Sequence, residues 1–312
     1  MIVWSIPMRT RFRGITVREG ALIRGEGGWG EWSPFLDYPD PAVAEPWLRA
    51  AEEAAGGDWP EPVRSSVPVN VTVPAVGPED AHRIALAGGC TTAKVKVGEP
   101  GQTLADDLAR VEAVRDALGP AGRIRVDVNG LWDVDTAVSA IGLLDRAVGL
   151  EYVEQPVASV EDLAAVRRRV DVPIAADESI RRAEDPFLVK RLAAADIAVL
   201  KVQPLGGVRA CLRIAEEIGL PVVVSSALET SVGIAAGVAL AAALPELPYA
   251  CGLATVQLLT DDLTASSLLP VDGALPVTVP TVSEPALRRL AAAPDRQAYW
   301  QRRLAEVRES RL

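Results

Sequence analysis

Two lysines separated by a single residue stand on a short apolar segment, residues 93–97. In a β-strand alternate side chains share one face, so Lys94 and Lys96 point to the same side. Neighbouring ammonium groups repel each other and resist burial, so we expect an anionic group to face them. An isolated Lys-x-Lys pair is also typical of an edge strand with solvated lysines, and the carboxylates further along the chain favour the buried alternative.

Three acidic side chains, Asp127, Glu154 and Asp177, stand at the ends of three successive apolar segments. One hard oxygen ligand from each of three neighbouring strands predicts a Mg²⁺ or Mn²⁺ site with positions left for water and substrate. A lone aspartate at a strand end is commonly a helix N-cap. Three in succession, with lysine-bearing strands on both sides, favour the metal site.

Lys96 precedes the three acidic segments and Lys201 follows them, so a closed ring of strands places these lysines on opposite sides of the metal. A proton next to a carboxylate is a very weak acid, and its removal needs cations to hold the enediolate and a neutral amine to take the proton. Nearby positive charge and partial desolvation lower the pKa of Lys96 or Lys201 enough to supply that amine. The single histidine, His82, is expected on the surface, which leaves acid–base chemistry to Lys, Asp, Glu or Tyr.

The segments that carry these residues follow a strand–helix rhythm that begins at residue 66 and repeats about every 25 residues, as in a (β/α) barrel. Active sites of such barrels lie at the carboxyl ends of the strands, where the lysines and acids stand. An open doubly wound sheet is the alternative, but eight strands in unbroken alternation favour closure. The predicted strands cover residues 67–73, 93–97, 124–128, 152–155, 174–177, 197–202, 222–225 and 250–253.

The ends of the chain leave this rhythm. Residues 2–32 predict a three-stranded antiparallel meander with turns at Glu19-Gly20 and at residues 25–27, followed by a helix over residues 41–55. The charged, mostly helical tail is expected to pack back on this meander and form one α+β cap over the barrel mouth. The predicted units are residues 1–65 for the N-terminal cap, 66–256 for the catalytic barrel and 257–312 for the C-terminal segment.

The composition restricts the partners. The chain has 312 residues, with 32 Lys and Arg against 42 Asp and Glu, which gives a net charge of −10 and argues against nucleic acid or an anionic membrane. Clustered lysines instead suit a small anionic carboxylate substrate. The scattered cysteines Cys90, Cys211 and Cys251, with no visible signal peptide, are typical of a cytoplasmic protein, and we expect a monomer.

These motifs resemble those of the enolase superfamily, in the subgroup with lysines on both sides of the metal. The resemblance covers the whole chain and implies an enolase-like modified TIM barrel with an α+β cap. The lack of a usable histidine argues against the mandelate-racemase-like branch. Residues 11–20, 28–34 and 225–233 resemble the o-succinylbenzoate synthases of the short actinobacterial type. The superfamily motifs are Lys94-x-Lys96, Asp127-x-Asn129, Glu154-Gln155-Pro156, Asp177-Glu178-Ser179 and Lys201.

The resemblance implies a role for each residue. Asp127, Glu154 and Asp177 would bind Mg²⁺. Lys96 would take the alpha proton of 2-succinyl-6-hydroxy-2,4-cyclohexadiene-1-carboxylate and then protonate the departing hydroxyl, a syn dehydration to 2-succinylbenzoate in menaquinone biosynthesis. Lys201 would stabilise the enediolate. The implied substrate contacts are Lys94, Asn129, Ser225, Ser226, Arg13 and Gly252; for the two serines and Arg13, turn hydroxyls and a solvated arginine are equally consistent with the sequence.

Three alternatives remain at this point. An N-succinylamino acid racemase or a dipeptide epimerase of the same superfamily would keep every lysine and acid named above. Dipeptide epimerases usually carry an acidic pair at the eighth strand end, and residues 251–255 contain no carboxylate, which weakens that alternative. A non-catalytic barrel that acts as a binding protein is expected to have lost at least one ligand or lysine, and none is missing.

Overall fold

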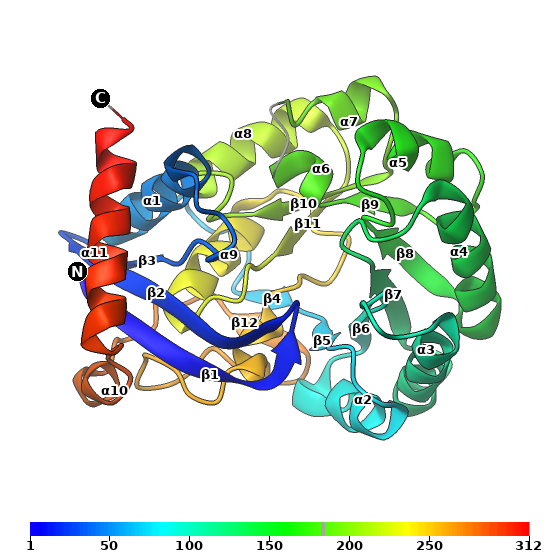
Figure 1. The fold of residues 1–312 in the computed structure, drawn as a ribbon, viewed down its shortest axis with the longest axis horizontal. Helices are drawn as coiled ribbons and strands as arrows, with labels where there is room; N and C mark the ends of the chain where they lie inside the picture. The colour runs from blue at the N-terminus through cyan, green and yellow to red at the C-terminus, as the bar shows by residue number, and fades with distance from the viewer. Residues whose placement is uncertain (182–184, 312) are drawn as a thin grey trace.

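The computed structural model describes residues 1–181 and 185–311. An N-terminal antiparallel sheet, with strand order β1-β2-β3, lies beside a larger barrel (Figure 1). Its elements are β1 (Ile2–Phe12), β2 (Ile15–Gly25), β3 (Gly28–Trp32) and α1 (Pro41–Gly56).

The first turn of this sheet lies at Arg13 and Gly14, where φ is 51° and 77°, so the predicted turn at Glu19-Gly20 is wrong. Strand β2 runs straight through Gly20. A Cβ atom on Gly20 would lie 2.6 Å from the ring of Trp4 and 2.5 Å from Cβ of Ser33. The glycine therefore allows a close approach inside a strand, a role that sequence alone does not separate from a turn.

The barrel sheet has seven parallel strands in the order β11-β10-β9-β8-β7-β6-β5. The α/β barrel expected from the sequence is confirmed. The strands are β5 (Val71–Val73), β6 (Thr92–Lys96), β7 (Arg123–Asp127), β8 (Leu150–Glu154), β9 (Ile174–Ala176), β10 (Ile197–Lys201) and β11 (Val222–Ser225).

The first and eighth predicted strands differ from the prediction. The first is divided into β4 (Ser66–Pro68), which pairs with β12 (Ala274–Pro276), and β5. The eighth is not a regular strand: Cys251 and Gly252 form isolated parallel bridges to Val69 and Ser225. These bridges join the end of β11 to the segment between β4 and β5, so the ring is completed by single bridges instead of a full strand.

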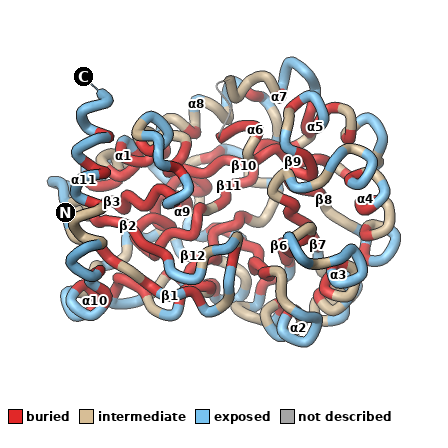
Figure 2. Tube along the Cα trace, in the orientation of Figure 1, coloured by how far each residue is buried: buried red, intermediate tan, exposed pale blue. Residues whose placement is uncertain are grey.

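Helices follow the strands and cover the outside of the sheet (Figure 1). Buried positions concentrate along the strands, whereas the outer helices are exposed on one side (Figure 2). The helices of the barrel are α2 (Pro78–Ala85), α3 (Leu104–Leu118), α4 (Val134–Val148), α5 (Val160–Arg167), α6 (Glu178–Arg181), α7 (Leu188–Arg191), α8 (Val208–Ile218) and α9 (Ser231–Ala243), with 3₁₀ turns η1 (Ala87–Gly89) and η2 (Ala254–Leu258). His82 lies on α2 with 41% of its side chain exposed, as predicted.

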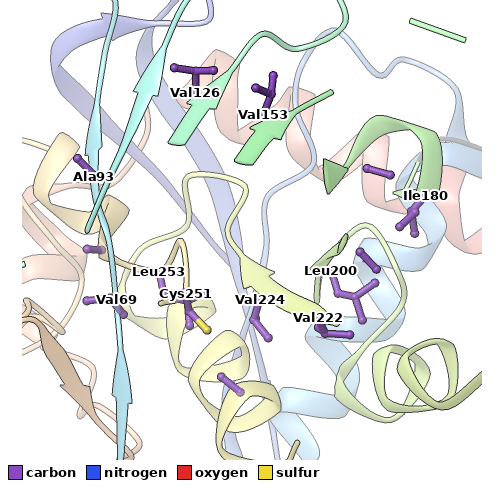
Figure 3. Close-up of a cluster of buried hydrophobic side chains, with 14 of the residues drawn as sticks. Val69, Ala93, Val126, Val153, Ile180, Leu200, Val222, Val224, Cys251 and Leu253 are labelled. Atoms are coloured by element: carbon purple, nitrogen blue, oxygen red, sulfur yellow. The ribbon is translucent and has the colours of Figure 1, made fainter. Parts of the chain in front are cut away.

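The two faces of each barrel strand have different surroundings. Val126 and Val153 are register partners on β7 and β8 and belong to the large apolar core of the barrel (Figure 3). The alternate residues point to the other face, where Tyr152, Val199 and Val223 form a small separate core. Because side chains alternate along a strand, the polar residues at the strand ends share this second face and lie above that small core.

The C-terminal tail packs on the N-terminal sheet. It contains α10 (Glu284–Arg289) and α11 (Pro294–Glu309), and α11 runs across the sheet in Figure 1. The N–H of Ser5 donates to the carbonyl of Leu290 at 3.0 Å. The rings of Trp32 and Trp300 meet edge to face at 5.3 Å, and both side chains are fully buried. Within the described ranges, every helix is too short or too polar to cross a bilayer.

Glu31 joins this cap to the barrel, and its replacement by glutamine is expected to destabilise the fold. Its carboxylate accepts hydrogen bonds from the N–H groups of Thr230 and Gly233, both at 3.1 Å, at the start of α9. In a glutamine one of the two accepting oxygens becomes an NH₂ group, which leaves donors such as the Ser33 hydroxyl without their acceptor, so we expect Glu31→Gln to cost about 1–3 kcal/mol of unfolding free energy. Urea denaturation measures this loss, and an unchanged midpoint would contradict it.

Candidate active site

The structure brings five of the predicted residues into one row at the carboxyl ends of neighbouring strands. Lys96, Asp127 and Glu154 are successive register partners on β6, β7 and β8. Asp177 directly follows β9, and Lys201 ends β10. We call these five residues the strand-end row. Its order in space is that of the sequence, with one lysine at each end and three acids between them.

Ion pairs connect the row. The Lys96 ammonium lies 2.5 Å from Oδ2 of Asp127, and at the other end the Lys201 ammonium lies 2.6 Å from Oδ2 of Asp177. Lys94 Nζ lies 2.8 Å from Oε1 of Glu154 and 3.1 Å from Oδ2 of Asp127. All six side chains are buried. The two terminal lysines therefore bind different carboxylates, and the third ammonium lies between two acids.

A fourth cation, Arg181 on α6, was missed in the sequence. Its Nε donates to Oδ1 of Asp177 at 2.8 Å, and its Nη2 lies 2.6 Å from Oε1 of Glu178. Its Nη1 is 2.9 Å from the hydroxyl oxygen of Tyr38, which comes from the cap. The spacing of four residues between Asp177 and Arg181 on a helix was the available signal.

The cluster is balanced in charge. Three lysines and Arg181 face the three acids of the strand-end row and Glu178. Oε1 of Glu178 also accepts from the amide of Asn129 at 3.2 Å, while Oε2 is buried without a hydrogen-bond partner among the described residues. Four cations thus meet four carboxylates in a volume with little access to water, where each charge needs a partner.

The surroundings shift the pKa values of the acids in opposite directions. Burial and the neighbouring Asp127 charge raise the pKa of Glu154 to about 7. Burial also raises the pKa of Asp127, but Lys96 and Lys94 outweigh it and hold this pKa well below its usual range. Arg181 and Lys201 likewise outweigh burial at Asp177 and lower its pKa. Asp127 and Asp177 are therefore anionic at neutral pH, and Glu154 titrates near it.

The two lysines of β6 also differ. Burial lowers the pKa of Lys94, but Glu154 and Asp127 outweigh burial and raise it above its ordinary value. Burial and the charge of Lys94 lower the pKa of Lys96 in spite of Asp127. Lys94 is therefore the permanent cation of the pair, and Lys96 is the amine that can lose its proton.

The acids fit a hard divalent cation by their chemistry. Carboxylate oxygens are the ligands that Mg²⁺ prefers, and Lys94 already holds Asp127 and Glu154 around one positive charge. Each acid of the strand-end row is turned toward an ammonium or guanidinium. Among residues 1–181 and 185–311, no group of three or more His, Cys, Asp and Glu side chains has the arrangement of a metal-binding cluster. The three acids are thus present in the structure, and their counterions are lysines and Arg181.

A cavity opens over the row, between cap and barrel. Residues from both lie on its wall, including the predicted substrate contacts Lys94, Asn129, Ser225, Ser226, Arg13 and Gly252. Of the strand-end row, Lys96, Asp127 and Lys201 reach the cavity wall. The structure adds wall residues that sequence reasoning missed: Phe12, Phe35, Thr72, Ala227, Leu228 and Thr255.

The predicted contacts lie at both ends of the row. Asn129 accepts from Lys96 Nζ at 2.6 Å. At the other end Ser225 is the register partner of Lys201, and the hydroxyl of the next residue, Ser226, shares a hydrogen bond of 2.7 Å with Thr255. A Cβ atom on Gly252 would lie 2.6 Å from Oγ of Ser225, so a larger residue at this position would displace the Ser225 hydroxyl. Thr72 is buried, and its hydroxyl has no hydrogen-bond partner among the described residues.

Fold and site define a class: a (β/α)-barrel enzyme with a capping domain and an acid row flanked by two lysines. Residues 3–55 match the family described as enolase N-terminal domain-like, and residues 78–282 match that described as enolase C-terminal domain-like. A muconate lactonizing enzyme from Pseudomonas fluorescens has the same fold, with a TM-score of 0.79 at 24% identity over 93% of this chain and 97% of that one. The L-Ala-D/L-Glu epimerase from Bacillus subtilis superposes with a TM-score of 0.75 at 24% identity, over 90% of this chain and 95% of that one.

More similar relatives identify the family within this class. The o-succinylbenzoate synthase of Thermobifida fusca is 68% identical over 98% of this chain and 95% of that protein. Those of Mycolicibacterium smegmatis and Mycobacterium tuberculosis are 56% and 54% identical, each over 96% of this chain and 91% of that protein. The chain belongs to the o-succinylbenzoate synthase family of the enolase superfamily, and the resemblance seen in its motifs is confirmed.

Proposed function

We propose that this enzyme, a carbon–oxygen lyase, converts 2-succinyl-6-hydroxy-2,4-cyclohexadiene-1-carboxylate to 2-succinylbenzoate by syn dehydration, a step of menaquinone biosynthesis. One structural observation carries the proposal: two buried lysines stand at opposite ends of a row of three acids. The identity of 54–68% to o-succinylbenzoate synthases over nearly the whole chain supports the same activity.

Enzymes of the enolase superfamily generally use Mg²⁺. We propose that Asp127, Glu154 and Asp177 hold this ion here, with Mn²⁺ as a second hard cation that the same oxygen donors accept. When bound, the cation draws negative charge onto the oxygens of the substrate carboxylate and so makes the neighbouring carbon more acidic.

Lys96 acts first as base and then as acid. Its neutral amine takes the alpha proton, and the electrons of the C–H bond pass toward the carboxylate. They then form the new ring double bond as the C–O bond breaks, and the Lys96 ammonium gives the proton to the departing hydroxyl, which leaves as water. One group on one face performs both transfers, so the elimination is syn. Asn129 at 2.6 Å orients the Lys96 nitrogen, and burial together with the charge of Lys94 lowers the pKa of this amine.

Lys201 and Lys94 supply fixed positive charge. Lys201, paired with Asp177, faces the opposite side of the substrate and stabilises the enediolate. Lys94, whose pKa is raised, stays charged and helps to hold the substrate carboxylate. The tail of the substrate, which ends in a second carboxylate, extends toward Ser225, Ser226 and Gly252, with Arg13 on the cap side of the cavity.

The activity is tested by following the loss of the cyclohexadiene absorbance with Mg²⁺ present. Metal-dependent formation of 2-succinylbenzoate supports the proposal, and an inactive purified enzyme refutes it. Racemisation of N-succinyl amino acids is the second candidate, because two lysines on opposite faces also serve that reaction. It is measured in parallel by polarimetry.

The pH dependence follows from the lowered pKa of Lys96. In the free enzyme Lys96 must be neutral to take the proton, so kcat/KM is expected to rise with pH up to the Lys96 pKa and then to level off. The rise should end below about 10.4, the ordinary pKa of lysine. A pH profile of kcat/KM measures it. An activity that increases toward low pH would exclude Lys96 as the base.

We also propose that the enzyme works in the cytoplasm as a monomer. The three cysteines are free and buried, as suits a protein without disulfides. Gel filtration with light scattering tests the monomer, and a defined dimer would contradict it.

A further inference from the structure

Arg18, on β2 of the cap, is a buried cation that the mechanism above does not use. Only 2% of it is exposed. Its Nε donates to the carbonyl of Leu228 and its Nη2 to that of Ala227, both at 3.2 Å. On the cap side it donates to the carbonyls of Ser33 and Glu19, the latter at 2.9 Å. One guanidinium therefore ties a segment of the barrel to two segments of the cap.

The barrel segment is residues 226–230, which we call the β11 loop. Ala227 and Leu228 of this loop lie on the cavity wall, directly after the proposed tail contacts Ser225 and Ser226. Leu228 has φ 63°, a left-handed conformation that is unfavourable for a branched aliphatic residue and needs support from its surroundings. The hydrogen bonds of Arg18 to this residue and the one before it provide such support.

The cap side of the contact also reaches the cavity. The Arg18 guanidinium lies 4.7 Å from the ring centroid of Phe35, and Phe35 is a wall residue. Arg13 lies over the same ring at 5.2 Å. Arg18 thus fixes Phe35 and the β11 loop relative to each other, and these are the two surfaces that face the tail side of the cavity.

Arg18 makes no direct hydrogen bond to the strand-end row among the described residues. The ion pairs of the row involve barrel residues, and the acceptors of Arg18 lie outside it. Burial lowers the pKa of Arg18 to about 10, so the guanidinium is still charged at neutral pH, with Glu31 and Glu229 as nearby compensating acids. Loss of Arg18 should therefore loosen the tail side of the cavity and leave the lysines and acids in place.

We propose that Arg18 is a positioning residue for substrate recognition: it holds the β11 loop against the cap and so shapes the wall that receives the carboxylate-ended tail of the substrate. The inference rests on the proposed function, because the tail is that of the proposed substrate and product. It assigns to Arg18 no contact with the reacting atoms. Its effect is on the affinity for tail-bearing ligands.

The test compares two ligands in the presence of Mg²⁺. 2-Succinylbenzoate carries both the ring carboxylate and the succinyl tail, whereas benzoate carries only the ring carboxylate. With Arg18→Met we expect calorimetry to show about tenfold or more weaker binding of 2-succinylbenzoate, while benzoate, measured by competition, changes less than about twofold. KM should rise more than kcat falls. Arg18→Lys keeps the charge and one or two hydrogen bonds, so an intermediate loss is expected.

Arg115 offers a matched control. Its guanidinium also donates to backbone carbonyls, of Val148 at 3.0 Å and of Gly122 at 2.6 Å, at helix and strand ends outside the cavity wall. Arg115→Met should lower the melting temperature without changing either affinity. An Arg18→Met enzyme that binds both ligands like the wild type, or weakens both equally, overturns the inference. If Arg18→Met does not fold, the same comparison with Arg18→Lys decides.

Measurements on the wild-type enzyme distinguish a failure of this inference from a failure of the proposed function. If the wild-type enzyme neither dehydrates the cyclohexadiene nor binds 2-succinylbenzoate, the proposed function is wrong. If it does both and the Arg18 variants show no selective loss, only the role of Arg18 is wrong.

Discussion

Lys96→Ala is expected to reduce kcat for dehydration by about 10⁴-fold or more, with no loss of the folded structure. General acid–base catalysis contributes about 10²–10⁴-fold per proton transfer, and Lys96 is assigned both transfers. Asp127 keeps Lys94 as a partner at 3.1 Å in the variant, so no carboxylate of the row is left without a cation. Initial rates from the cyclohexadiene absorbance, with circular dichroism as the check on folding, measure the effect.

Two further lysine variants serve as controls. Lys201→Ala removes charge stabilisation and leaves the base, so a loss of about 10²–10³-fold is expected, smaller than that of Lys96→Ala. Lys190 on α7 donates to the carbonyl of Glu217 at the surface, and Lys190→Ala should retain full activity. A Lys96→Ala enzyme with the rate of the Lys190 control would refute the assigned roles.

The strand-end row could be predicted because its determinants are local. Each acid or lysine stands at the end of an apolar segment, and a parallel βα repeat brings all such ends to one side of the barrel. The interval of about 25 residues was enough to place Lys96 and Lys201 at opposite ends of the row. Neither the identity of the neighbouring strand nor its register had to be known for this.

The residues that sequence reasoning missed depend on contacts between distant parts of the chain. Arg18 meets the carbonyl of Leu228, 210 positions later, and Tyr38 meets Arg181, 143 positions later. Nothing in the sequence around an arginine distinguishes one that binds carbonyls across two domains from one in solvent. A buried cation becomes recognisable only when its acceptors are known.

The eighth strand was predicted as regular because residues 250–253 are short and apolar. In the structure, the N–H of Gly252 donates to the Val224 carbonyl at 2.8 Å, but the pairing with β11 is a single bridge at this residue, and a side chain there would meet Ser225. The proline-containing segment before it, residues 245–249, ends without strand pairing. The periodicity of apolar residues locates apolar segments. It does not show over how many residues a segment stays hydrogen-bonded to the neighbouring strand.

Glu154→Gln is expected to weaken Mg²⁺ binding by about 100-fold or more, at least the loss that removal of an outer-shell partner causes, and to abolish activity at Mg²⁺ concentrations that just saturate the wild type. A carboxamide carries no charge, and its nitrogen cannot bind a hard cation. Glu154 also binds Lys94 at 2.8 Å, so a cation competes with this ammonium for the same oxygens. Calorimetric titration with Mg²⁺ measures the affinity.

Glu151 is a matched control because it stands on the same strand, β8, and is also ion-paired. Its partners are Arg125 at 2.5 Å and Arg123 at 2.9 Å, at the opposite end of the strand from Glu154. Arg125 is fully buried, and Glu151→Gln removes the negative charge that it pairs with. The variant should therefore have a lower melting temperature. It should leave Mg²⁺ affinity unchanged. Equal loss of affinity in both variants would show that the effect comes from general destabilisation.

The balance of charge adds a further consequence of metal removal. Four cations and four carboxylates give the cluster a charge near zero, so a bound divalent cation would add two positive charges to a buried volume. A ligand with two carboxylates restores neutrality, and each should therefore favour binding of the other. In wild type, chelation of Mg²⁺ should abolish activity reversibly and weaken 2-succinylbenzoate binding by about 5–150-fold. In Glu154→Gln, the same chelation should have almost no further effect on product affinity, and an undiminished effect would remove Glu154 from the metal site.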